Sequence, residues 1–91
     1  GKNQILFKTC FQQLRGEGVG MSNPAGVGWP EPSTFWVIKE EEIRKHFIGK
    51  IAGVANPPQI YKQAINGLQS AGHIVQNEGF VWFTDSFGKA R

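Results

Sequence analysis

The chain has 91 residues, of which 40% are hydrophobic and 12% aromatic, enough for one small domain with its own core. This composition excludes a disordered chain, and the absence of an apolar run near the ~20 residues of a membrane span argues against a membrane protein. A formal net charge of +3 allows a polyanionic partner without requiring one.

The first predicted element is a helix over residues 3–15. Its apolar residues recur at helical spacing, which is typical of a helix with one buried stripe. The stripe consists of Ile5, Leu6, Phe7, Cys10, Phe11 and Leu14. Asn3 is the expected N-cap, and Gly16 and Gly18 are expected to end the helix.

Residues 16–33 are rich in Gly and Pro, which predicts a long loop with no regular element. We expect Trp29 to fold back from this loop onto the core. The glycines at 16, 18 and 20 resemble part of a nucleotide-binding loop. Such a loop needs a preceding strand and a following helix, whereas a helix precedes this one, so we do not interpret it as a phosphate site.

A short strand is predicted at residues 34–38, where bulky residues with high strand propensity follow one another. The carboxylates of Glu40 to Glu42 come next, as is typical of a helix N-terminus, and Ile43 and Phe47 give that second helix an apolar face. We interpret the carboxylates as helix initiation rather than as an active site. A turn is expected from Gly49 to Ala55.

A third helix is predicted over residues 57–71, with Asn56 as its cap and two prolines in its first turn. Its inward stripe is Tyr61, Ala64, Ile65 and Leu68, and Gly72 ends it. Two strands are predicted at residues 73–76 and 80–83, and the short turn between them at 77–79 predicts a hairpin. Residues 85–91 are expected to form a frayed tail.

This order of elements predicts a single α+β domain, residues 1–91, with three helices packed on a small three-stranded antiparallel sheet. Residues 60–75 resemble the recognition helix and first wing strand of the winged-helix (winged helix-turn-helix) superfamily, with Tyr61, Ile65, Leu68 and Gly72 at the matching places. Residues 37–43 resemble the strand and acidic start of that fold's second helix. Residues 35–38 and 68–72 are also similar to C-terminal winged-helix domains of mobile-element DNA-processing proteins, such as conjugative relaxases and primase-helicases.

The resemblance implies a DNA-binding domain in which the helix at 57–71 reads the DNA. Its face opposite the core carries amides and one lysine but no acid, and Gln and Asn can bond to the adenine edge in the major groove. Base and phosphate contacts are expected from Gln59, Lys62, Gln63, Asn66, Arg44, Lys45, Lys50 and, on the wing, Asn77. The wing tip has Glu78 and no basic residue, so Lys89 and Arg91 of the tail are candidates for the missing charge.

An alternative is a protein–protein interaction domain of winged-helix form, which predicts an exposed apolar patch on the sheet face. An enzyme is not expected, because no nucleophile adjoins a candidate base. No cofactor or metal is expected, since His46, His73, Cys10 and Asp85 match no ligand spacing. The DNA partner is left open between duplex and single strand.

The chain begins with Gly rather than Met, so we expect it to be an accessory domain of a larger DNA-processing or regulatory protein, such as a relaxase or helicase. With one cysteine, Cys10, no intramolecular disulfide can form. A lone thiol fits a reducing compartment, so we expect a cytoplasmic protein.

Overall fold

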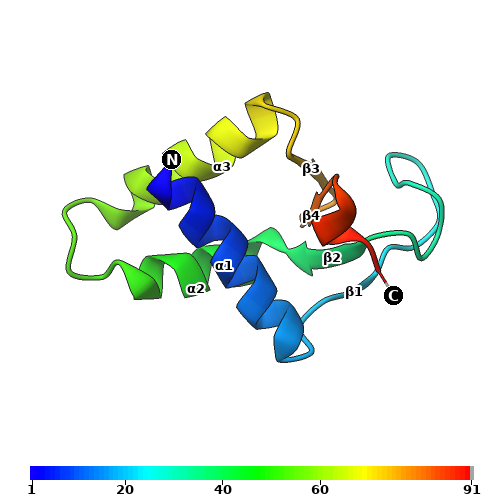
Figure 1. Cartoon of the computed structure of the whole chain (residues 1–91), viewed down its shortest axis with the longest axis horizontal. Coiled ribbons are helices and arrows are strands. Elements are labelled where there is room, and N and C mark those ends of the chain that lie inside the picture. Colours follow the sequence, from blue (N-terminus) through cyan, green and yellow to red (C-terminus); the bar gives the residue numbers. More distant parts are fainter. Residues whose placement is uncertain (91) are drawn as a thin grey trace.

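The structure is a computed structural model that describes residues 1–90. Three helices lie on one side of a small antiparallel sheet, which makes the domain α+β (Figure 1). The helices and strands are, in chain order, α1 (Lys2–Gly16), β1 (Met21–Ser22), β2 (Trp36–Lys39), α2 (Glu40–Lys50), α3 (Pro57–Ser70), β3 (Ile74–Asn77), β4 (Phe80–Phe83) and the short 3-10 helix η1 (Ser86–Gly88).

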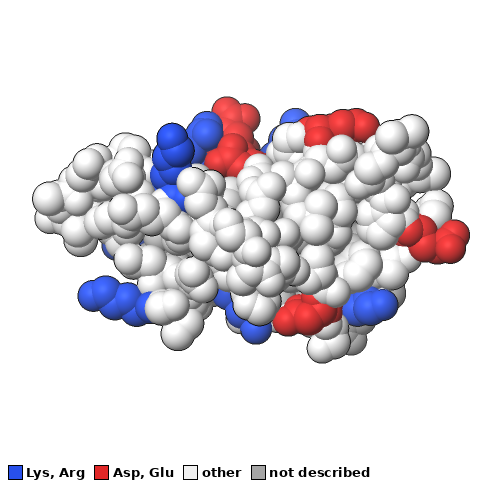
Figure 2. All heavy atoms as spheres, turned by 90° about the horizontal axis from the view of Figure 1, so that it is seen from above, with Lys and Arg blue, Asp and Glu red and all other residues white. Residues whose placement is uncertain are grey.

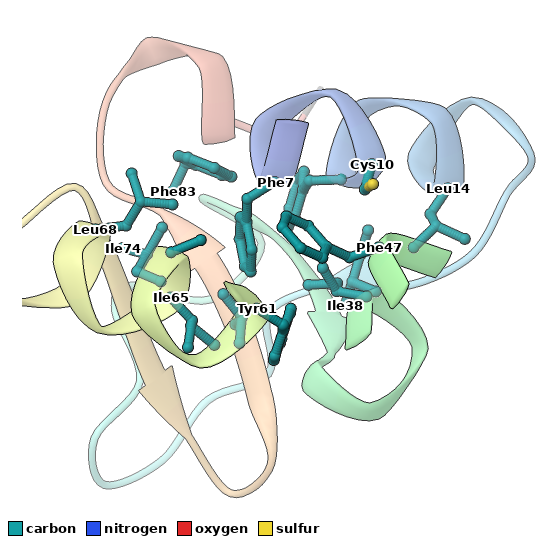
Figure 3. Packing of buried hydrophobic residues seen from close by; sticks show 14 residues of the cluster. Phe7, Cys10, Leu14, Ile38, Phe47, Tyr61, Ile65, Leu68, Ile74 and Phe83 are labelled. Carbon is teal, nitrogen blue, oxygen red and sulfur yellow. The ribbon is translucent and has the colours of Figure 1, made fainter. Parts of the chain in front are cut away.

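The core forms where the apolar stripes of the three helices meet the inner face of the sheet (Figure 3). The stripe predicted for α3 is confirmed, with Tyr61 and Leu68 buried, and that of α1 is confirmed at Phe7 and Phe11. The prediction for Ile5 was wrong: its side chain is 68% exposed, because α1 buries only the face that carries Phe7, Cys10, Phe11 and Leu14. Aromatic rings fill the centre, with Phe7 stacked on Tyr61 and Phe11 set edge-on to Phe83. α1 lies across α2 and α3 and packs against both of them (Figure 1).

The sheet has four strands in the order β1-β2-β4-β3, so the expectation of three strands was wrong. The additional strand is β1, which lies within the segment expected to be an irregular loop and pairs with β2 through Met21 and Val37. β1 has only two residues, too few to produce a recognisable alternation in the sequence. The predicted hairpin is present, but its first strand is one residue later than predicted and includes Asn77. Its turn therefore consists only of Glu78 and Gly79, both at positive φ.

The rest of the Gly- and Pro-rich segment covers the outer face of the sheet. On β4, Val81 and Phe83 point into the core, while Trp82 points to the opposite face and is nevertheless 4% exposed. Trp29 stacks on Trp82 with ring centroids 5.2 Å apart and meets Phe80 edge-on. Trp29 therefore packs on the outer face of the sheet, and not on the core as the sequence suggested.

Asn23 holds this loop in place from a fully buried position, with 2% of its surface exposed. Its side-chain amide donates to the carbonyls of Pro24, Pro30 and Glu31, at 3.0–3.1 Å. Its side-chain oxygen accepts from the backbone N–H groups of Thr34 and Phe35, at 2.9 and 2.8 Å. One side chain thus bonds five backbone groups of the loop, of which only the Thr34 N–H and the Glu31 carbonyl also bond each other.

The helix termini differ from expectation in small ways. α1 begins at Lys2 with Gly1 at the N-cap position, so Asn3 lies inside the helix. α2 continues to Lys50, past the glycine at which a turn was expected. Asn56 precedes α3 in a left-handed conformation and makes no side-chain capping bond, so only its placement was correct.

The segment expected to be a frayed tail is packed through residue 90. Phe87 of η1 meets Phe11 and Phe83, with centroids 5.9 and 5.0 Å apart. The backbone N–H of Ala90 donates to Thr34, and Arg15 donates to two carbonyls of this segment. Residues 85–90 are therefore part of the fold, whereas Arg91, a candidate for supplying charge, lies outside the described residues.

Candidate nucleic-acid interface

The candidate interface is the outward face of α3. Because Tyr61, Ala64, Ile65 and Leu68 are buried in the core, the residues half a turn away must face solvent. The exposed residues of the helix are all uncharged or basic: Pro58, Gln59, Lys62, Gln63, Asn66, Gln69 and Ser70. The four α3 residues predicted from the sequence to contact DNA therefore lie on one accessible, acid-free face.

This face continues onto the hairpin. The side-chain amide of Gln76 on β3 donates to the side-chain oxygen of Gln69, at 2.7 Å. Gln76 was not among the predicted site residues, although strand alternation places it on the helix side of the sheet, with Ile74. Viewed from the α3 side, the molecule has a largely uncharged centre with basic and acidic groups around its margin (Figure 2).

The basic residues predicted on α2 are exposed, but they do not all join this face. Arg44 lies beside α3, where its guanidinium forms an ion pair with Glu40 at 3.2 Å. Lys50 is exposed in the last turn of α2, and among the described residues no hydrogen bond or ion pair joins it to α3. Lys45 is exposed on the part of α2 that points away from its buried residues. Of the α2 candidates, only Arg44 therefore lies next to α3.

Asn77 is engaged elsewhere. Its side-chain amide donates to the carbonyl of Val27 at 3.3 Å, and its side chain lies against Gly28 of the long loop. The alternation that turns Gln76 toward α3 turns Asn77 to the other side of the sheet. We therefore interpret Asn77 as a residue that joins the loop to the hairpin. On the wing, Gln76 rather than Asn77 is the candidate residue next to α3.

A partly buried hydrogen bond fixes α3 against α2. The Tyr61 hydroxyl donates to Glu40 at 2.7 Å, and the same carboxylate accepts from Arg44. Glu40 also joins the hairpin, since its backbone N–H donates to Gly79. The pKa of Tyr61 is raised well above its usual range, mainly by burial and secondly by the hydrogen bond to Glu40. The carboxylate of Glu40 is thus part of the scaffold that orients α3.

This pKa shift predicts a loss of stability in alkali. The folded state holds the Tyr61 proton more tightly than the unfolded chain, whose tyrosine ionises near pH 10. The stabilisation is therefore complete below about pH 10 and is lost as the pH rises further, because only the unfolded chain then releases the proton. Tyr61 is the only tyrosine, so ultraviolet difference spectroscopy should show tyrosinate appearing together with unfolding rather than before it.

The matched variant is Tyr61→Phe, which we expect to cost about 1–2 kcal/mol at neutral pH, because Glu40 loses a partner. Because the variant has no tyrosine to ionise, its free energy of unfolding should fall less than that of the wild type as the pH rises above about 10. A tyrosinate signal from the folded wild-type protein near pH 10 would contradict this assignment.

Within the described part of the chain, no three His, Cys, Asp or Glu side chains gather into a group that could hold a metal ion. The thiol of Cys10 is buried, and burial raises its pKa, so it is held in the protonated form. None of the helices in residues 1–90 has the length and apolar character needed to cross a bilayer. Comparison with protein family models, with curated proteins and with solved structures gives no match.

Proposed function

We propose that this is a DNA-binding domain of winged-helix form, with α3 as the recognition helix and the β3–β4 hairpin as the wing. The observation that carries the proposal is the acid-free face of α3, which presents four amides and one lysine to solvent. The order β2-β4-β3 beside three helices supports it, because this arrangement puts the hairpin next to the C-terminal end of α3.

The chemistry of the face fits reading of the major groove. Gln and Asn side chains can donate to and accept from adenine at once, and each such pair discriminates by about 1–3 kcal/mol. Lys62 is the one cation on the face and would contact a phosphate, which positions the helix without selecting a sequence. With Arg44 partly neutralised by Glu40, we propose a modest affinity that depends on salt.

The alternative, a protein-interaction domain, keeps part of its support. It requires an apolar patch on the sheet face, where Val37 and Trp82 are buried, the latter beneath Trp29, whereas Met21 and Val75 on the two edge strands are 41% and 37% exposed. The single lysine on α3 and the acidic residue at the wing tip still favour this alternative, so the test must separate the two.

Fluorescence anisotropy with duplex and single-stranded DNA at low and physiological salt provides that test. Lys62→Gln should weaken binding to all sequences alike and reduce the salt slope by about 1. Gln63→Ala should instead reduce discrimination between sequences, while Gln13→Ala, an exposed glutamine on α1, should change neither. Binding that is unaffected by Lys62→Gln, or that shows no dependence on salt, would exclude α3 as the DNA-binding element.

A further inference from the structure

We infer that the groove between α1 and the C-terminal segment binds a phosphate group. This groove is a hollow of about 620 Å³ at the end of α1. It is lined by Gln12, Arg15, Gly16, Ser86, Phe87, Lys89 and Ala90. Two of these side chains are cationic, two carry neutral hydrogen-bonding groups, and none is a carboxylate. The groove contains no residue of α3 and is therefore separate from the proposed DNA-reading face.

Arg15 is held in position before any ligand arrives. Its Nη1 and Nη2 donate to the carbonyls of Phe87 and Lys89, at 3.3 and 2.8 Å. Its guanidinium also lies over the ring of Trp36, 5.3 Å from the ring centre. A guanidinium has five N–H groups, so three remain after these two bonds. A fixed guanidinium with free donors loses little side-chain entropy when it binds an oxyanion.

Lys89 provides a second positive charge at the rim of the groove. Its ammonium lies over the ring of Phe35, 5.1 Å from the centre, and forms no ion pair within residues 1–90. A third cation, Lys8, lies over Phe87, 4.5 Å from that ring centre, but it lines a neighbouring hollow rather than this groove. Two acids adjoin the lining along the chain, Asp85 beside Ser86 and Glu17 beside Gly16. Asp85 directs its carboxylate to the backbone N–H of Phe87, and Glu17 is exposed at the end of α1. The positive charge at the groove is therefore not cancelled by a carboxylate in its lining.

The donors suit phosphate better than a carboxylate ligand. Arg15 can bond two oxygens in parallel, which matches the geometry of both anions. Lys89, Ser86 and Gln12 add further donors around the same hollow, and phosphate has the additional oxygens to accept from them. A purely structural role, tying the C-terminal segment to α1 and to Phe35, accounts for the two bonds of Arg15 and for the ring contact of Lys89, but it does not use the three remaining N–H groups of Arg15.

A free phosphate ion and the backbone of a nucleic acid would present the same chemistry, and titrations can separate them. Nitrogen–proton correlation spectra of the 91-residue protein would be followed with inorganic phosphate, with a short single-stranded DNA and, as an ionic-strength control, with sodium chloride. We expect saturable shifts at Gln12, Gly16, Ser86 and the Arg15 side chain. If DNA binds more tightly and phosphate displaces it from these residues, the ligand is a strand backbone. If phosphate gives saturable shifts at these residues and DNA gives none, the site takes a free phosphate group.

Variants make the assignment falsifiable. Lys89→Gln should weaken phosphate binding about five- to tenfold, since it removes one charge-assisted contact. It leaves the backbone carbonyl to which Arg15 donates, so the fold should be intact. Lys2→Gln removes an equally exposed lysine from the other end of α1 and should have no effect. Shifts that do not saturate, that chloride reproduces, or that persist unchanged in Lys89→Gln would overturn the inference. Signals from α3 report on the proposed DNA-reading face separately.

Discussion

Replacing Asn23 by Ala should lower the free energy of unfolding by about 3–5 kcal/mol. The substitution removes the bonds of Asn23 to five backbone groups. The N–H of Thr34 and the carbonyl of Glu31 still bond each other, whereas the N–H of Phe35 and the carbonyls of Pro24 and Pro30 lose their partner. Each buried polar group left unsatisfied costs about 1–3 kcal/mol, reduced where water can reach it. Because domains of this size are stable by only about 5–15 kcal/mol, the loss is a large part of the total.

The loop should be released before the core in this variant. Trp29 is held against Trp82 by the loop that Asn23 organises, so near-ultraviolet circular dichroism of the stacked indoles reports its release. Far-ultraviolet dichroism reports the helices. We expect the two signals to coincide in the wild-type protein and to separate on urea titration of Asn23→Ala. Asn66→Ala, at an exposed asparagine of α3, should stay within about 0.5 kcal/mol of the wild type. An Asn23→Ala protein as stable as that control would refute the role of Asn23.

Gly88→Ala should cost about 2–3 kcal/mol and detach the C-terminal segment. A Cβ at this position would overlap the backbone carbonyl of Phe83, which cannot move aside as a flexible side chain would. η1 must then shift, and with it Phe87 leaves its contacts with Phe11 and Phe83. The bonds from Arg15 to the same segment would break as well.

Gly49→Ala is the matched control, because a Cβ there meets nothing within 4 Å. Gly49 lies in the last turn of α2, where the preference for alanine is at most the roughly 0.5–1 kcal/mol of a helix interior, so this variant should be at least as stable as the wild type. Thermal unfolding of the two variants measures the contrast. Amide hydrogen exchange at residues 85–90 shows whether the segment detaches in Gly88→Ala. Equal stability of the two variants would mean that the C-terminal segment contributes nothing to the fold.

The sequence was sufficient for the elements whose burial follows a regular period. The stripe of α3, with Tyr61, Ile65 and Leu68 buried, could be read from helical spacing. The outward direction of Lys62 and Gln63 follows from the same geometry. The hairpin around Glu78 and Gly79 could likewise be predicted, since both strands are rich in strand-forming residues and the turn is short. In these segments the burial of a residue, or its pairing across the turn, depends on residues only a few positions away in the chain.

Only the tertiary structure decided where the irregular segments lie. Asn23 bonds residues up to 12 positions away, and Arg15 bonds carbonyls 72 and 74 positions away, contacts that no local period encodes. For this reason the sequence did not reveal that the Gly- and Pro-rich loop covers the outer sheet face, nor that residues 85–90 close a groove against α1. The same reason explains the exchange of Asn77 for Gln76 at the candidate interface. Strand alternation limits each side chain to one of two faces, but only packing against the loop determines which face is covered.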